Sequence, residues 1–321
     1  MKSNYRYIVK AFMAMAVIAG TTSCDDFLDR EPMSSISPET YYSTAAQLEA
    51  NLNDEYPNVL PSFGQWTYGI FGEDKGTDNQ IEVNANDRYT QDRWKVPHSE
   101  SDNWKFERIY RINFFLSEAL PKFGEDMSGS QNTISGSVAT IKHYIGEMYF
   151  LRAYEYFKKL QLFGDFPIIN QPLADEMEAL REASKRFPRN EVARFIISDL
   201  DKAYAYMSDV DMATTRINKD VAMLVKSRVA LFEATWLQNF KGTAFVPGGE
   251  GWPGASLHNN YQYPSGNIDN EVKYFLEQAV EASKLVADKY KGSLTENTGV
   301  LQQSADDPSN PYFDMFAQEE D

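Results

Sequence analysis

Cysteine is almost absent from this chain of 321 residues, which contains one, Cys24. A lone cysteine cannot form a disulfide within the chain, so the fold is expected to need none. Histidine is also scarce, and His98, His143 and His258 lie far apart in the sequence. The zinc-binding pattern HExxH, a pair of cysteines and the nucleophile motif GxSxG are all missing. We therefore expect no metal site, no cofactor and no catalytic residue.

Basic residues are in the minority, because 31 Lys and Arg stand against 47 Asp and Glu and give a net charge of −16. Such a chain repels phosphate backbones and anionic headgroups, which argues against nucleic acid as a partner. Hydrophobic residues make up 42% of the chain and aromatic residues 14%. This composition predicts a packed globular body rather than disorder.

Long apolar runs are missing except at residues 11–20, AFMAMAVIAG, which follow the positive charges of Lys2, Arg6 and Lys10. Ten apolar residues are too few to cross a bilayer as a helix. A short apolar run behind a basic N-terminus is typical of a signal peptide. The sequence thus predicts export from the cytoplasm.

The position of Cys24, directly after the apolar run and three small residues, resembles a bacterial lipoprotein signal. The usual aliphatic residue three positions earlier is replaced by Thr21. We predict a signal peptide over residues 1–23, a lipid such as palmitate on Cys24, and an acidic tether over residues 24–36. Several acyl chains together give stable membrane anchoring. The alternative is an ordinary secretory signal in which the cysteine stands by chance.

Most of the remaining chain has the periodicity of α-helices. Apolar residues recur at helical spacing in the segments 103–122, 137–163, 190–207 and 218–237, and in one that begins at Asp269 or Asn270 and ends at Gly292. A further helix is expected from Ser37 to Tyr56, ended by Pro57, and Asn190 and Asn218 are further candidate N-caps. The expected fold is all-α, with stacked helical hairpins of the tetratricopeptide type over residues 37–321.

Several side chains can be assigned to the core or to the surface from this pattern. Trp104 and Trp236 are assigned to apolar helix faces, whereas His143 is assigned to a helix surface. Asp199 and Asp201 are expected on solvated helix faces. With 47 acidic residues, some carboxylate pairs will lie 5–10 Å apart by chance, so the sequence identifies no glycosidase pair.

Five segments carry a resemblance to a known family. In chain order they are CDDFLDREP at 24–32, WKFERIYRIN at 104–113, MYFLRAYEYFKKLQLFGDFPII at 148–169, NKDVAMLVKSRVALFEATW at 218–236 and GTAFVPGGEGWPG at 242–254. The longest joins a long helix to a Gly-Asp-Phe-Pro exit. Together they resemble the SusD/RagB family of outer-membrane nutrient-binding lipoproteins, in the family's own order along the chain.

This resemblance implies a function and partners. Family members capture oligosaccharides or polysaccharides at the cell surface and pass them to a SusC-like TonB-dependent transporter in the outer membrane. Acidic residues after the cysteine resemble the family's surface-export signal. Members usually continue well beyond this length, so the chain is interpreted as an N-terminal portion that lacks most of the C-terminal region.

Sugar binding needs flat aromatic rings that stack on pyranose faces, and polar groups that bridge hydroxyls. Gly- and Pro-rich loops supply candidates for both at residues 57–102 and 238–268. The predicted ligand-binding residues are Trp66, Trp252 and Trp94 for stacking, and Asp74, Asp78 and Asn79 for hydrogen bonds. For each tryptophan the alternative is a loop ring that fills the core, because tryptophan is highly buried on average.

Two other functions stay open at this point. One is a glycan hydrolase on a helical scaffold, and the other is a scaffold that holds the transporter or a peptide without touching sugar. Formation of a product would indicate the first, and the absence of sugar binding would indicate the second. The sequence does not identify the glycan.

Overall fold

The computed structural model describes residues 41–61, 103–124, 126–208 and 212–294. Residues 1–41 form one unit and residues 42–321 a second, and every helix described below belongs to the second. The predicted lipidation and binding residues Cys24, Trp66, Trp94, Asp74, Asp78 and Asn79 lie outside the described residues. The expectations about them, and about the signal peptide and tether, stay predictions.

The described part of the chain is all-α, as expected. Its helices are α3 (Ala45–Val59), α4 (Glu107–Phe123), α5 (Val138–Phe163), α6 (Met177–Ala183), α7 (Arg189–Tyr206), α8 (Lys219–Asn239) and α9 (Ile268–Tyr290), with a 3₁₀ helix at Pro253–Ser256. Within the described ranges β-structure is limited to two isolated bridges. None of these helices combines the length and the apolar character needed to cross a membrane.

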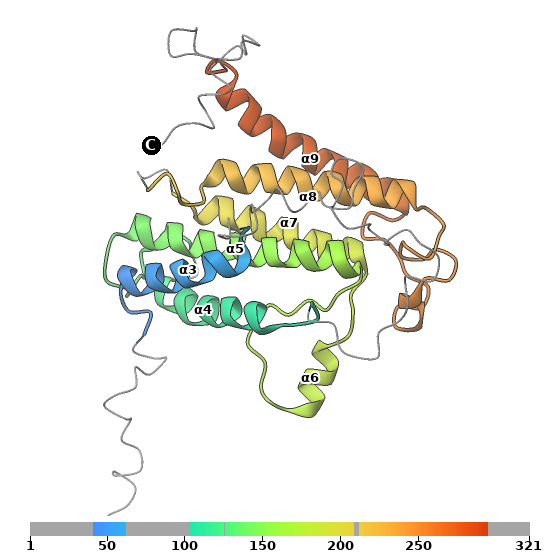
Figure 1. Cartoon of the computed structure of the whole chain (residues 1–321), viewed down its shortest axis with the longest axis horizontal. Helices are drawn as coiled ribbons and strands as arrows, with labels where there is room; N and C mark the ends of the chain where they lie inside the picture. Colours follow the sequence, from blue (N-terminus) through green and yellow to red (C-terminus); the bar gives the residue numbers. More distant parts are fainter. Residues whose placement is uncertain (1–40, 62–102, 125, 209–211, 295–321) are drawn as a thin grey trace, which may run out of the picture. The chain divides into compact units, whose positions relative to one another are not determined.

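Four long helices stack side by side in chain order, α5, α7, α8 and α9, with α3 and α4 on the other side of α5 (Figure 1). The end of α5 meets the start of α7, where Arg189 N–H donates to Asp165 Oδ1 at 2.9 Å. The same Arg189 reaches Glu233 near the end of α8. At the opposite end of the stack, Lys289 of α9 pairs with Asp220 of α8 at 2.6 Å. Neighbouring helices therefore run antiparallel, as helical hairpins do.

Helix α5 is the centre of this arrangement. Its buried residues lie on every side of the helix, which is expected for a helix covered by α3, α4 and α7. Gly146 permits the closest approach, because a Cβ there would lie 2.8 Å from Met207 N and 2.9 Å from Ala203 O. A side chain at this position would push α7 away from α5, so glycine is required here.

The helices predicted at 137–163 and 218–237 are confirmed as α5 and α8. Each has a polar cap that supplies an acceptor to a free backbone N–H in the first turn. Ser137 Oγ accepts from Thr140 N at 3.4 Å, and Asn218 Oδ1 accepts from Val221 N at 3.0 Å. Strong periodicity combined with a capping residue therefore located these helices within about two residues.

The helix predicted from Ser37 to Tyr56 is wrong at both ends. It begins at Ala45, and residues 41–44 are not helical. Thr44 and Gln47 form a capping box, which satisfies two backbone N–H groups and fixes the start. Pro57 lies inside the last turn instead of ending the helix, because a proline there removes only one hydrogen bond.

Two further N-caps differ from the prediction. Asn190 lies inside the first turn of α7, buried, and its amide donates to Glu271 Oε1 at 3.0 Å. Asn267 caps α9, in place of Asp269 or Asn270, and accepts from Asn270 N at 2.9 Å. At the start of α7 the N-cap position is Pro188, which makes no side-chain cap, whereas at the start of α9 several neighbouring polar residues were possible caps.

Three burial assignments are also corrected. Trp104 precedes α4 and is half-buried among Phe106, Phe163 and Phe166, so it is not part of a helix face. His143 and Asp199 are buried instead of solvated. Trp236 is half-buried at the edge of the core, whereas Asp201 is exposed as predicted.

Buried ion pairs join the helices of the stack. Arg152 of α5 donates to both carboxylate oxygens of Asp199 of α7, at 2.6 and 2.8 Å, and to Asn113 of α4 at 2.9 Å. Arg194 of α7 pairs with Glu271 of α9 at 2.7 Å. Burial alone would raise the pKa of Glu271, but hydrogen bonds from Arg194, Asn190 and Ser265 lower it below its ordinary value. Each of these carboxylates is thus held by donors on both of its oxygens.

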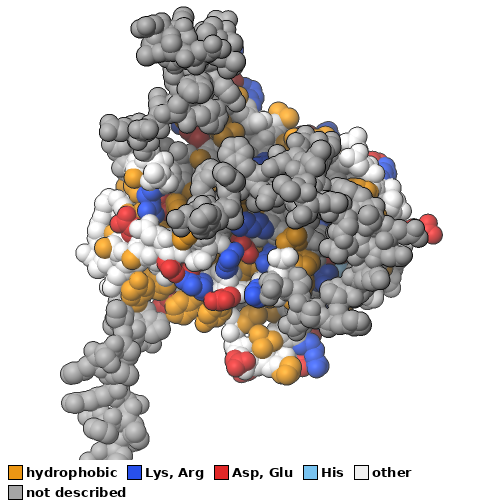
Figure 2. Space-filling view, in the orientation of Figure 1, with side chains coloured by type: hydrophobic (Ala, Val, Ile, Leu, Met, Phe, Trp, Pro, Cys, Tyr) orange, Lys and Arg blue, Asp and Glu red, His pale blue; other side chains and the backbone are white. Residues whose placement is uncertain are grey.

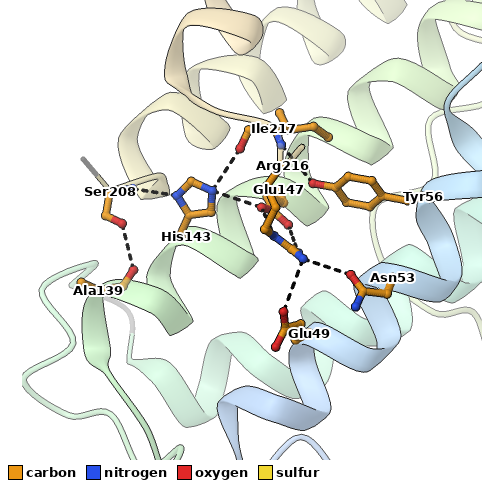
Figure 3. A network of polar contacts seen from close by, with 9 residues as sticks. All are labelled: Glu49, Asn53, Tyr56, Ala139, His143, Glu147, Ser208, Arg216 and Ile217. Atoms are coloured by element: carbon orange, nitrogen blue, oxygen red, sulfur yellow. Dashed lines mark hydrogen bonds and ion pairs between the residues drawn. The ribbon is translucent and has the colours of Figure 1, made fainter. Parts of the chain in front are cut away.

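Figure 3 shows a second polar network, which ties the segment before α8 to α3 and α5. Arg216 donates to both oxygens of the buried Glu147, at 2.8 and 2.5 Å. His143 Nε2 lies 3.0 Å from Ile217 O and 3.1 Å from Glu147. Tyr56 accepts from Ile217 N at 3.1 Å, and burial raises the pKa of its hydroxyl. His143 thus holds the backbone in place inside the protein.

Replacement of Asp199 by asparagine is expected to destabilise the protein by about 3–5 kcal/mol, because Arg152 keeps its charge and loses its buried counter-ion. The control is Asp288→Asn on α9, where the side chain is 60% exposed and pairs with Lys284, which is exposed as well. That control should cost at most about 1 kcal/mol. Urea unfolding followed by circular dichroism measures both changes, and equal losses would contradict the role given to the buried pair.

Candidate ligand-binding site

A pocket of about 520 Å³ lies at one end of the helix stack. The antiparallel order brings together there the ends of α5 and α8, the start of α7 and the loop after α8. Its side chains include Asp165, Arg186, Arg189, Trp236, Phe245 and Trp252. The two motifs GDFP and GGEGWPG, far apart in the sequence, meet at this pocket.

Trp252 forms the inner wall. Its side chain is 5% exposed, and its ring stacks on His258 at 5.9 Å between centroids. The indole Nε1–H donates to Asp165 Oδ2 at 2.7 Å. A Cβ at Gly254 would lie 2.2 Å from the Trp252 ring, so glycine is needed where the chain passes this ring. Trp252 therefore borders the pocket with most of its surface covered, and its contact with a sugar stays a prediction.

Asp165 joins three segments at this wall. Its Oδ2 accepts from Trp252, and its Oδ1 accepts from the backbone N–H of Arg189 at 2.9 Å. Burial raises the pKa of Asp165, although both hydrogen bonds oppose that shift. The carboxyl group thus fixes the loop around Trp252 to the turn between α5 and α7.

Arg189 lines the pocket and is paired with Glu233, which is buried in the protein. Arg189 Nη2 lies 2.8 Å from Glu233 Oε2, and Arg189 Nε lies 3.0 Å from Oε1. Burial raises the pKa of Glu233 despite the neighbouring guanidinium. That guanidinium also lies over the ring of Trp236, 4.1 Å from its centroid. The positive charge of Arg189 is therefore already matched within the protein.

An open aromatic cluster forms the outer rim. The ring centroids of Trp236 and Phe240 are 4.6 Å apart, and those of Phe240 and Phe245 are 5.4 Å apart. Trp236 Nε1 donates to Phe245 O at 3.1 Å. Phe245 is 61% exposed, so one flat ring at the rim is open to a ligand.

The sequence prediction missed Phe245 and assigned Trp236 to the core. The rule that selected Trp252, an aromatic residue in a Gly/Pro loop without helical periodicity, also applies to Phe245. Trp236 stands in the last turns of α8, next to the buried Ala234 and Leu237, and borders the pocket. Periodicity along one helix does not reveal which of its sides borders a pocket.

A smaller pocket of about 290 Å³ lies between α4 and α6. Most of its lining is apolar, from residues such as Phe106, Ile109 and Leu173, with Gln171 and Ser184 as polar members. Figure 2 shows hydrophobic side chains gathered over these two helices, beside charged ones. This pocket offers few groups that could bridge sugar hydroxyls, so the larger one is the better candidate.

The chemistry available in the larger pocket is that of binding. The carboxyl groups of Asp165 and Glu233 are engaged in structural hydrogen bonds. Among the described residues, no three His, Cys, Asp or Glu side chains are placed to hold a metal ion. What the pocket presents to a ligand is an exposed ring, amide and backbone groups, and the guanidinium of Arg186.

Replacement of Trp252 by phenylalanine is expected to destabilise the protein by about 1–3 kcal/mol, because the Asp165 carboxylate loses a buried donor. Trp236→Phe is the control, since its indole N–H donates at an exposed position where water can replace it. That variant should lose about 1 kcal/mol or less. The unfolding midpoint in urea measures both, and a smaller loss for Trp252→Phe than for Trp236→Phe would show that the wall is not built as described.

Several solved structures and curated proteins are similar to this chain. A SusD-like carbohydrate binding protein from Bacteroides vulgatus aligns with a TM-score of 0.46 and 14% identity, over 80% of this chain and 47% of the other. A SusD-like protein from Bacteroides fragilis aligns with a TM-score of 0.40 and 17% identity, over 66% and 40%. SusD-like protein P2 of Formosa agariphila is 25% identical over 253 residues, which cover 75% of this chain and 46% of the relative.

A second protein of the same organism, SusD-like protein P25, is 25% identical over 233 residues, 67% of this chain and 41% of the relative. The chain thus spans less than half the length of these curated relatives. The model of a SusD-like family, described as starch-binding and associating with the outer membrane, matches residues 26–231. This match covers more than half of the 321 residues, and the chain therefore belongs to the SusD/RagB family.

Proposed function

We propose that this chain is a glycan-binding protein of the outer membrane that captures an oligosaccharide without altering it. The observation that carries the proposal is the match of residues 26–231 to a family described as starch-binding and associated with the outer membrane. The acidic chain also suits a neutral or cationic ligand better than a polyanion such as nucleic acid.

The larger pocket supports this proposal through its dimensions and its lining. About 520 Å³ lies within the range of small-molecule sites. The exposed ring of Phe245 offers a flat apolar face of the kind that stacks on a sugar. Behind it, Trp252 and Asp165 form a wall that is already ordered, so little conformational entropy is lost on binding.

The segment before α4 is proposed to supply the rest of the binding surface. Its rings are Trp66 and Trp94, and its hydrogen-bonding groups are Asp74, Asp78 and Asn79. These residues are proposed from the sequence alone, because they lie outside the described ranges. The proposed ligand contacts in the described part are Phe245 and the exposed edge of Trp252.

Location and delivery complete the proposal. A lipid on Cys24 holds the protein on the outer membrane, facing the cell exterior. From there it passes the glycan to a SusC-like TonB-dependent transporter. The lipid holds the binding domain near the membrane and thereby raises its effective concentration at the transporter.

Titration of the full chain with an array of neutral and acidic oligosaccharides tests the binding function, with calorimetry on the best ligand. Trp66→Ala and Phe245→Ala are each expected to weaken binding about tenfold, because each removes a stacking ring. Leu231→Ala is the control, since Leu231 is similarly exposed, at 50%, on α8.

Two outcomes would contradict this proposed function, and a third would remove only the site assignment. The absence of any bound glycan would favour a pure interaction scaffold. Release of shortened products during incubation would identify a hydrolase. Unchanged affinity in both Trp66→Ala and Phe245→Ala would leave the function standing and remove the site assignment.

Lipid attachment is tested separately by metabolic labelling with palmitate. The chain with its natural sequence should carry the label and sediment with membranes. The Cys24→Ser variant should lose the label and remain in the supernatant. Thr21→Leu restores the usual aliphatic residue before the cysteine and should be labelled at least as well. The absence of label from the chain with its natural sequence would refute the lipid anchor.

A further inference from the structure

Arginines are almost always paired in the described part of this chain. It contains nine of them, and seven form ion pairs with carboxylates. Arg186 and Arg228 have no carboxylate partner among the described residues. Both residues are exposed, Arg228 on α8 and Arg186 at the larger pocket, which it lines. In a chain with 47 acidic residues against 31 basic ones, an unpaired arginine at a pocket is an informative exception.

The side chain and backbone of Arg186 are both held in place. Its guanidinium lies over the ring of Trp104, 4.6 Å from the centroid. Its carbonyl oxygen is 2.8 Å from His258 Nε2, and the next residue, Phe187, exchanges two backbone hydrogen bonds with Phe166. Stacking on a ring face leaves the N–H edges of a guanidinium available. Arg186 is therefore ordered for a further partner.

The other charges of the pocket do not supply that partner. Glu233 is bound to Arg189 at 2.8 Å. Asp165 accepts from Trp252 and from the backbone N–H of Arg189. With these groups matched, the pocket retains one positive charge that has no counter-ion in the described part of the protein.

We infer that the ligand of this pocket is an acidic oligosaccharide, and that Arg186 recognises a uronate carboxylate on it. A guanidinium presents a planar fork of donors that fits a carboxylate through two parallel hydrogen bonds. The exposed ring of Phe245, at the same pocket, stacks on a neighbouring sugar. This inference rests on the proposed glycan binding and adds the chemical class of the glycan.

Because the chain has a net charge of −16, its selection of an anion must come from a local contact within the pocket. The surface as a whole repels acidic ligands at long range. Salt screens this repulsion, so it is strong only at low ionic strength. At the pocket, the carboxylate would meet an exposed guanidinium that already has one face covered by Trp104, and charge-assisted hydrogen bonds are stronger than neutral ones. The preference should therefore depend on this one residue and not on overall charge.

The test is a glycan array on which each uronate-containing oligosaccharide is paired with its carboxyl-reduced form, which has the same backbone and no charge. The measured quantity is the ratio of dissociation constants, reduced over acidic, for the full chain. We expect the best ligand to be acidic with a ratio of about ten, the fold-change of one charge-assisted hydrogen bond. Arg186→Gln should bring the ratio to about one, and Arg228→Gln should leave it unchanged.

Each of the other outcomes contradicts either the proposed function or one part of the inference about Arg186. Binding of no glycan at all refutes the proposed function, and this inference with it. Binding of neutral glycans with no preference for acidic forms leaves the proposed function intact and overturns the inference. An Arg186→Gln variant that loses reduced and acidic ligands equally, so that the ratio stays at ten, assigns Arg186 a structural role only. An equal fall of the ratio in Arg228→Gln would attribute the preference to overall charge.

Discussion

Arginine pairs with fully buried carboxylates fix how the helices of this protein align. The pairs are Arg152–Asp199 between α5 and α7, Arg189–Glu233 between α7 and α8, and Arg194–Glu271 between α7 and α9. A buried pair adds little net stability, because desolvation offsets the attraction, but a misaligned pair leaves two buried charges without partners. Apolar helix faces alone tolerate sliding along one another. We interpret these pairs as the groups that exclude every alignment except one.

The pocket depends on that alignment. Arg189 donates its backbone N–H to Asp165 at the end of α5, and its guanidinium binds Glu233 near the end of α8. A shift of α8 by one turn, about 5.4 Å, would break the pair and move Trp236 away from the rim. The position of the aromatic cluster is therefore set inside the helix stack, by a residue that takes no part in the proposed recognition of the ligand.

What could be predicted from the sequence depends on the distance between the residues involved. Helices α5 and α8 were located because periodicity and caps are properties of neighbouring residues. The burial of Asp199 could not be predicted, because its partner Arg152 is 47 residues away. The same holds for Trp252, which was correctly placed in an irregular loop but whose indole partner, Asp165, is 87 residues away. Pairings of this kind are decided by tertiary structure, and a single sequence contains no signal for them.

The site also separates residues that hold the protein together from residues that face a ligand. Asp165, Arg189 and Trp252 use their polar groups on one another or on Glu233. Phe245 and Arg186 contribute no side-chain hydrogen bond to the described structure and contact it only through their rings or stacking surfaces. Under the proposed glycan binding, a change in Phe245 or Arg186 would alter ligand preference while the helix alignment is preserved. In that proposal one helical scaffold can serve different glycans, since the ligand preference lies in side chains that the fold does not need.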